Sequence, residues 1–136
     1  MASIDDVREI ALALPGAEES VSGHTGAAAW RLKGGQFAWL RGPSATDLRQ
    51  LAERGRSWPD GVVLAVRVAD LEEKEALLAA EPEMLFSIPH FDGYPGLLVR
   101  LDVVDRARLA EIVTDAWLVR APARVAKEWL RSHGLD

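Results

Sequence analysis

The sequence predicts an α+β fold, in which one antiparallel sheet carries helices packed on one side. Three observations indicate this class. Strand-like apolar runs do not alternate strictly with helical segments, a Gly-Gly pair separates two of these runs, and two consecutive helical segments close the sequence. With 136 residues the chain can bury one substantial core, so we expect a single domain over 1–136.

The first element is predicted to be a helix over roughly 4–14. Ser3 can cap its N-terminus, and Asp6, three residues later, resembles the second half of a capping box. Apolar residues recur at helical spacing on one face of this segment. The Pro15-Gly16 pair ends the helix, because proline and glycine both favour the end of a helix.

Residues 27–41 are predicted to form a hairpin, because two apolar runs flank the pair Gly34-Gly35, which suits tight primed turns. A two-residue turn at this pair fixes which side chains share a face. The core face would carry Trp30, Leu32, Phe37 and Trp39. The opposite face would carry Arg31, Lys33 and Gln36.

The middle of the chain is predicted to hold a short helix followed by a buried strand. The helix falls within 46–55, with Thr46 or Asp47 as its N-cap. The apolar and branched run at 62–68 is typical of a central strand.

The second half of the chain is predicted to hold a capped helix, a strand and two final helices. Asp70 is the expected N-cap of a helix over 70–82, and Glu73 would complete its capping box. A loop then leads to the last strand. That strand and the two final helices are predicted over 96–103, 105–119 and 122–133.

The composition excludes several classes of protein. The absence of cysteine excludes disulfides, thiolate metal sites and a cysteine nucleophile. No signal peptide opens the sequence, and no apolar run reaches the ~20 residues that span a bilayer, so we expect a cytoplasmic protein without membrane contact. The net charge of −5 disfavours a general attraction to nucleic acid, and any such contact must use a local basic patch.

The stretch SIPHFDGYPG at 87–96 allows two interpretations. As a turn, its prolines restrict the backbone and Asp92-Gly93 reverses the chain. As a site, His90, Asp92 and Tyr94 would surround the mouth of a pocket and contact a ligand. No activated serine accompanies this group, and the other histidines, His24 and His133, are isolated in the sequence. We therefore expect no catalytic residues, no metal and no cofactor.

Basic residues recur at helical spacing near the end of the chain. Three of them, Arg124, Lys127 and Arg131, fall on one face of the final helix, and Arg120 precedes it. Together with Arg31 and Lys33 of the hairpin, they could form a stripe that contacts phosphates. The alternative is an ordinary solvated helix face.

Four stretches resemble the MmcQ/YjbR family of small bacterial proteins. They are ALALPGAEES at 11–20, AAAWRLKGGQFAWL at 27–40, PHFDGYPGLLVRL at 89–101 and EIVTDAWLVRAPARV at 111–125. Residues 42–61 depart most from the family pattern. The resemblance implies a helix-flanked antiparallel sheet in a double-wing arrangement. It also suggests DNA binding, and it brings no catalytic residues to transfer.

Two functions stand as hypotheses. The first is a non-catalytic binding module of MmcQ/YjbR type that contacts DNA through its local basic patch. The second is a protein- or peptide-binding adaptor that could form homodimers and makes no nucleic-acid contact. The adaptor would use an apolar patch around four aromatic residues, Trp58, Phe86, Phe91 and Tyr94. An enzyme would need a pocket that joins His90 to a nucleophile or a metal, and the sequence indicates none.

Overall fold

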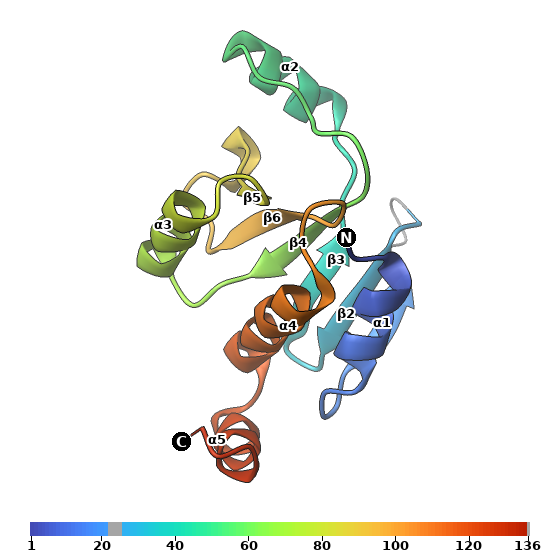
Figure 1. Cartoon of the computed structure of the whole chain (residues 1–136), viewed down its shortest axis with the longest axis vertical. Helices are drawn as coiled ribbons and strands as arrows, with labels where there is room; N and C mark the ends of the chain where they lie inside the picture. The colour runs from blue at the N-terminus through green and yellow to red at the C-terminus, as the bar shows by residue number, and fades with distance from the viewer. Residues whose placement is uncertain (22–25, 136) are drawn as a thin grey trace.

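The described residues of the computed structural model, 1–21 and 26–135, contain a six-stranded antiparallel sheet and five α-helices (Figure 1). The strands are β1 (Glu18–Val21), β2 (Ala28–Leu32), β3 (Gly35–Leu40), β4 (Val63–Arg67), β5 (Leu85–Phe86) and β6 (Gly96–Arg100). The helices are α1 (Ile4–Leu12), α2 (Ala45–Glu53), α3 (Leu71–Ala80), α4 (Arg106–Arg120) and α5 (Ala123–Ser132), with a 3-10 turn, η1, at Pro89–Phe91. The strand order is β1-β2-β3-β4-β6-β5, which confirms the predicted α+β class.

Alternate residues of the central strands face two separate hydrophobic clusters, as the two-residue period of a strand requires. In β4, Leu64 and Val66 belong to the main cluster, whereas Val63 and Ala65 belong to a second, smaller one. Residues of α1, α3, α4 and α5 pack in the main cluster. The prediction of helices on one side therefore holds for four of the five described helices. Helix α2, through Leu51, packs in the second cluster.

The register of the β2–β3 hairpin differs from the predicted one. Leu32 pairs with Gly35, so the turn residues are Lys33 and Gly34 rather than the two glycines. A bulge beside Trp30 then shifts the pairing by one further residue along the ribbon.

The bulge explains why Trp39 does not lie on the predicted face. Phe37 has no partner across the hairpin, and both Phe37 and Ala38 are buried in the main cluster. The alternation of faces is therefore displaced by one residue. Trp39, predicted to share the face of Trp30, packs instead in the second cluster, 6.4 Å from the ring of Phe91.

The helix caps confirm some predictions and correct others. Ser3 and Asp6 form the predicted capping box of α1. The N-cap of α2 is Ser44, not Thr46 or Asp47, because the Ser44 hydroxyl accepts the backbone N–H of Asp47 while the Asp47 carboxylate accepts that of Ser44. In α3 the Asp70 side chain caps the helix without a reciprocal bond from Glu73. Strands β1 and β5 and the turn η1 were not predicted.

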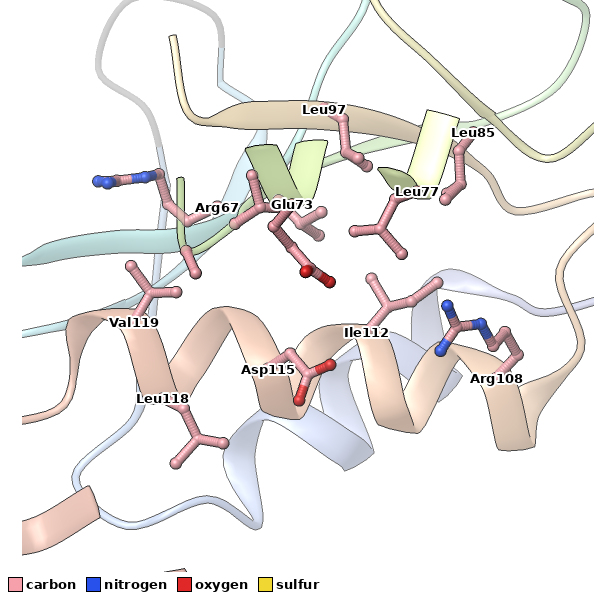
Figure 2. A pocket seen from close by; sticks show the side chains of 13 residues that line it. Arg67, Glu73, Leu77, Leu85, Leu97, Arg108, Ile112, Asp115, Leu118 and Val119 are labelled. Atoms are coloured by element: carbon pink, nitrogen blue, oxygen red, sulfur yellow. The ribbon is translucent and has the colours of Figure 1, made fainter. Parts of the chain in front are cut away.

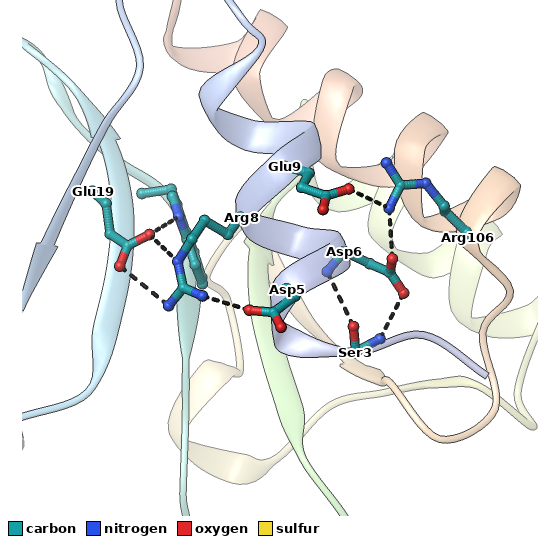
Figure 3. Close-up of polar contacts among 8 residues, drawn as sticks. Ser3, Asp5, Asp6, Arg8, Glu9, Glu19 and Arg106 are labelled. Carbon is teal, nitrogen blue, oxygen red and sulfur yellow. Dashed lines mark hydrogen bonds and ion pairs between the residues drawn. The ribbon is translucent and has the colours of Figure 1, made fainter.

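Polar contacts fix α1 between the hairpin and α4 (Figure 3). The Arg8 guanidinium donates to Glu19 on β1 at 2.8 Å, and the same carboxylate accepts the indole N–H of buried Trp30 at 3.0 Å. On the other side of α1, Arg106 of α4 pairs with the carboxylates of Asp6 and Glu9. These last contacts join segments about 100 residues apart in the sequence.

Candidate functional site

Most of the sixteen lysines and arginines are already engaged within the protein. Arg8, Arg41 and Arg108, for example, form ion pairs with N–O distances of 2.6–2.8 Å, and Arg56 and Arg100 donate to backbone carbonyls. In the described residues, four cations make no hydrogen bond, ion pair or ring contact, and these are Arg31, Lys33, Arg124 and Lys127. All four belong to the basic set that the sequence predicted.

The hairpin end and the start of α5 border one shallow hollow of about 710 Å³. Arg31 and Lys33 line it from the hairpin, and Pro122 and Val125 line it from the junction with α5. The structure therefore brings together two basic segments that lie about 90 residues apart in the sequence. We call the four unpaired cations of these segments, Arg31, Lys33, Arg124 and Lys127, the basic surface.

Arg120 lies between these segments and has a structural contact of its own. Its Nε donates to the backbone oxygen of Gln36 at 3.0 Å. Its guanidinium also covers Gly35, where a β-carbon would lie 3.1 Å from the guanidinium carbon. Arg120 thus holds the end of α4 against the hairpin, and it is only partly exposed.

Helix α5 presents its basic residues to solvent. Val125 and Trp129 pack against the main cluster, whereas Arg124 and Lys127 lie on the outer side and Arg131 is exposed. Spacings of three and four residues place the three cations on one side of the helix, as predicted. No residue of α5 is fully buried, and Figure 1 shows α5 and α2 at opposite ends of the long axis of the molecule.

Acidic residues moderate the basic surface without pairing with it. Glu18 lines the same hollow and lies opposite Arg31 in the β1–β2 register, and Glu128 is exposed on α5. Neither is within ion-pair distance of the four cations in the described structure. Helix α3, which carries Glu72, Glu73 and Glu75, lies well away from α5 in Figure 1.

The second group of predicted site residues lies elsewhere, on the loop that contains η1. His90 and Asp92 are exposed, and Asp92 lies 3.9 Å from Arg54, which follows α2. Tyr94 is half-buried, with its ring 5.3 Å from the ring of Phe91. Nothing in the described structure joins this group to the basic surface.

A buried lysine that the sequence did not reveal anchors this loop. Lys74 of α3 is 4% exposed, and its ammonium donates to the backbone oxygens of Phe91 at 2.6 Å and Tyr94 at 2.9 Å. Burial lowers the pKa of Lys74, and the negative charges of Asp92 and Glu75 oppose that change. The signal in the sequence is weak, since Lys74 stands among the glutamates of a charged helix.

The aromatic residues proposed for an adaptor surface pack mainly against one another. Phe91 is buried, and Trp58, Phe86 and Tyr94 are half-buried in the second cluster. The rings of Trp58 and Phe86 meet edge to face with centroids 5.7 Å apart. These side chains therefore stabilise the packing of α2 and η1 on the sheet.

The described residues hold neither a metal centre nor a membrane span. No group of three or more histidine, aspartate or glutamate side chains among them is placed to hold a metal ion. None of the described helices is long and apolar enough to cross a bilayer. His24 lies outside the described residues, and His133 stacks on Trp129 with centroids 3.9 Å apart.

The fold and the basic surface together define a class of protein, an α+β protein with a single sheet. Among the described residues, its unpaired cations lie at the hairpin end and on the last helix. The chain belongs to the YjbR family, whose family model matches residues 12–119. This match confirms the resemblance drawn from the sequence motifs.

Similar proteins support the same assignment. Uncharacterised proteins of Mycobacterium tuberculosis (Rv2570) and Mycobacterium bovis (Mb2600) are each 39% identical over 134 residues, which cover 98% of this chain and 100% of each relative. A crystal structure of the Deinococcus radiodurans protein DR2400, with a domain described as DUF419, aligns with a TM-score of 0.66. That alignment covers 100% of this chain and 91% of the other at 20% identity, and it shows the shared fold.

Proposed function

We propose that this YjbR protein is a non-catalytic binding module that contacts the phosphates of DNA through its basic surface. One observation carries the proposal. Among the described lysines and arginines, the four without any partner are Arg31, Lys33, Arg124 and Lys127, and they belong to two segments that border one hollow. A cation that is not neutralised by a carboxylate remains available for a phosphate.

The arrangement suits backbone contact rather than base recognition. The hairpin end offers two cations, and the outer face of α5, a helix whose Val125 borders the same hollow, offers two more. A footprint of about four cations supports weak binding, with dissociation constants of about 10⁻⁴ to 10⁻⁶ M, which is typical of contacts without sequence recognition. The net charge of −5 further weakens the attraction, and the release of counterions at each phosphate contact makes binding weaken as salt rises.

Fluorescence anisotropy with a labelled duplex of about 20 base pairs, over a salt series from about 50 to 200 mM, tests the proposal. If four phosphates are contacted, the logarithm of the binding constant should fall against the logarithm of salt with a slope of about −3.6. The double substitution Arg124→Ala and Lys127→Ala removes half of the basic surface. It should weaken binding and reduce the size of that slope by about 1.8.

A matched control removes two exposed arginines from the opposite end of the molecule. Arg49→Ala and Arg54→Ala change the net charge equally, but they lie on and after α2 and already face carboxylates at 3.7 and 3.9 Å. The control should keep the slope of the wild-type protein. Absence of binding at about 50 mM salt, or equal weakening by both pairs, would overturn the proposal. The first of these outcomes would leave the protein-binding adaptor as the stronger hypothesis.

A further inference from the structure

A second hollow, of about 520 Å³, lies between α3 and α4 on the helix-covered face of the sheet (Figure 2). Its floor is formed by aliphatic side chains of β4, β6 and β5, including Val66, Leu97 and Leu85. Leu77 of α3 and Ile112 of α4 close its sides. The volume falls within the range of about 300–1,000 Å³ that is usual for small-molecule sites, and the lining is mostly apolar, as in those sites.

At the hollow, the arginines have hydrogen-bond partners within the protein and the two unpaired carboxylates do not. Both cations are occupied: Arg108 donates to Glu81 at 2.6 and 3.0 Å, and Arg67 donates to the backbone oxygen of Pro95 at 3.2 Å. The side chains of Glu73 and Asp115, in contrast, have no hydrogen bond or ion pair within the described structure. Figure 2 shows Glu73 reaching from α3 and Asp115 from α4 into the same space.

We propose that this hollow binds a small amine, a molecule with an apolar body that lies on the aliphatic floor and an ammonium group that pairs with Glu73 and Asp115. Charge complementarity determines the ligand class. Both carboxylates are exposed and have no hydrogen-bonded protein partner in the described structure, whereas both arginines have one, so the hollow offers unpaired negative charge and no unpaired positive charge. A charge-assisted hydrogen bond to an ammonium over an apolar surface would neutralise that negative charge.

The electrostatics of Asp115 support the same ligand. Partial burial raises the pKa of Asp115, Glu73 and Glu111 raise it further, and Arg108 opposes them. Asp115 is exposed, so its carboxylate is open to an incoming ligand. An ammonium beside Asp115 would favour the ionised form, so binding of an amine should lower the pKa of this carboxyl group.

The experiment is a ¹H–¹⁵N NMR titration of the full chain with phenethylamine, compared with its neutral isostere 2-phenylethanol at the same pH. The amine should shift the amide signals of lining residues, such as Val68, Leu77 and Val119, and the alcohol should shift them much less. A ¹³C titration of the Asp115 carboxyl group, with and without phenethylamine, should show its pKa fall on binding. The spectra also report directly whether each variant is folded.

Isosteric variants distinguish the contribution of the two carboxylates to amine affinity from the general effect of removing one negative charge. Asp115→Asn and Glu73→Gln should each weaken the amine about tenfold, the usual effect of losing one charge-assisted bond. The control is Glu72→Gln, an exposed residue of α3 that does not line the hollow, and it should leave the affinity unchanged. Equal shifts with amine and alcohol, no shift of lining amides at millimolar amine, or unchanged affinity in Asp115→Asn would each overturn the proposal.

Discussion

At the scale of single residues, two buried polar side chains each fix a segment to its neighbour. Asp47 is 1% exposed, and its carboxylate accepts from the Ser44 backbone and from the Arg41 guanidinium at 2.7 Å. Lys74 connects α3 to the loop after η1 in the same way. Buried ionised groups persist only where several hydrogen bonds offset their loss of hydration, and both residues meet this condition.

Replacing Lys74 by methionine keeps most of the apolar stem but removes both ammonium bonds to the loop. The two carbonyls each retain one backbone N–H, from Tyr94 and Gly96, so the expected loss is only about 1 kcal/mol of unfolding free energy. Urea unfolding at neutral pH measures this change, and hydrogen exchange should show faster opening of residues 89–95.

Lys127→Met provides the matched control, because Lys127 lies on the outer side of α5 and makes no contact in the described structure. It should leave the unfolding free energy within about 0.5 kcal/mol of the wild-type value. If Lys74→Met were as stable as this control and the loop exchanged at the same rate, the anchoring role of Lys74 would be wrong.

At the scale of elements, the β2–β3 hairpin depends on the close approach of Arg120 to Gly35. Gly35 has a φ of +141°, which glycine adopts readily, and the Arg120 guanidinium lies where a β-carbon would meet it. This requirement explains the register that the structure adopts. Glycine is needed as the first residue of β3, so the turn moves one residue towards Lys33.

Gly35→Ala tests this explanation. The added methyl group would strain the backbone and displace Arg120, and we expect a loss of about 1–3 kcal/mol in thermal or denaturant unfolding. Gly34→Ala is the matched comparison, because Gly34 has no positive φ and a β-carbon there would meet no heavy atom within 4 Å. A loss in Gly34→Ala as large as that in Gly35→Ala would show that the close approach of Arg120 does not determine the register.

The sequence predicted the elements of this fold better than their pairing. Periodic apolar residues and capping residues such as Ser3 and Asp70 located all five described helices, because these signals are local. The bulge beside Trp30 is a feature of how two strands pair, and no local pattern in the sequence marks it. Strand β1 was missed because its residues, Glu18–Val21, are mostly exposed and show no apolar alternation.

For the candidate site too, the sequence predicted the local features but not the contacts between distant segments. Helical spacing was enough to place Arg124 and Lys127 on one face of α5. That the hairpin cations border the same hollow as α5 follows from the tertiary fold, and so does the engagement of Arg120 by the backbone of Gln36. The carboxylates of the second hollow come from α3 and α4, about 40 residues apart, and no motif joins them.

At the scale of the whole molecule, ion pairs connect the first helix to α4. Asp6 caps its own helix and also pairs with Arg106 of α4, and these hydrogen bonds hold the pKa of Asp6 below its usual range. A carboxyl group whose pKa is lower in the folded protein than in the unfolded chain stabilises the fold above the unfolded pKa. That contribution is lost as the pH falls through the folded pKa.

Asp6→Asn should therefore be less stable than the wild-type protein at neutral pH, and the two should become similar in acid. Because an unfolded aspartate titrates near pH 3.9, the difference in melting temperature should begin to shrink below about pH 4. Differential scanning calorimetry over about pH 2–7 measures this difference. Asp60→Asn, at an exposed residue, controls for the general effect of one less negative charge. A difference that stays constant with pH would contradict the assigned pairing.

The joining of α1 to α4 also bears on how the protein is made. The backbone N–H of Ala2 donates to the backbone oxygen of Leu101, and the indole N–H of Trp117 donates to the backbone oxygen of Pro15. Neither hydrogen bond can form until the residue about 100 positions downstream has been synthesised. At synthesis rates of about 5–20 residues per second, the nascent helix would remain without its partner for roughly 5–20 s on the ribosome. During that interval the apolar face of α1 has to stay unaggregated without α4 to cover it.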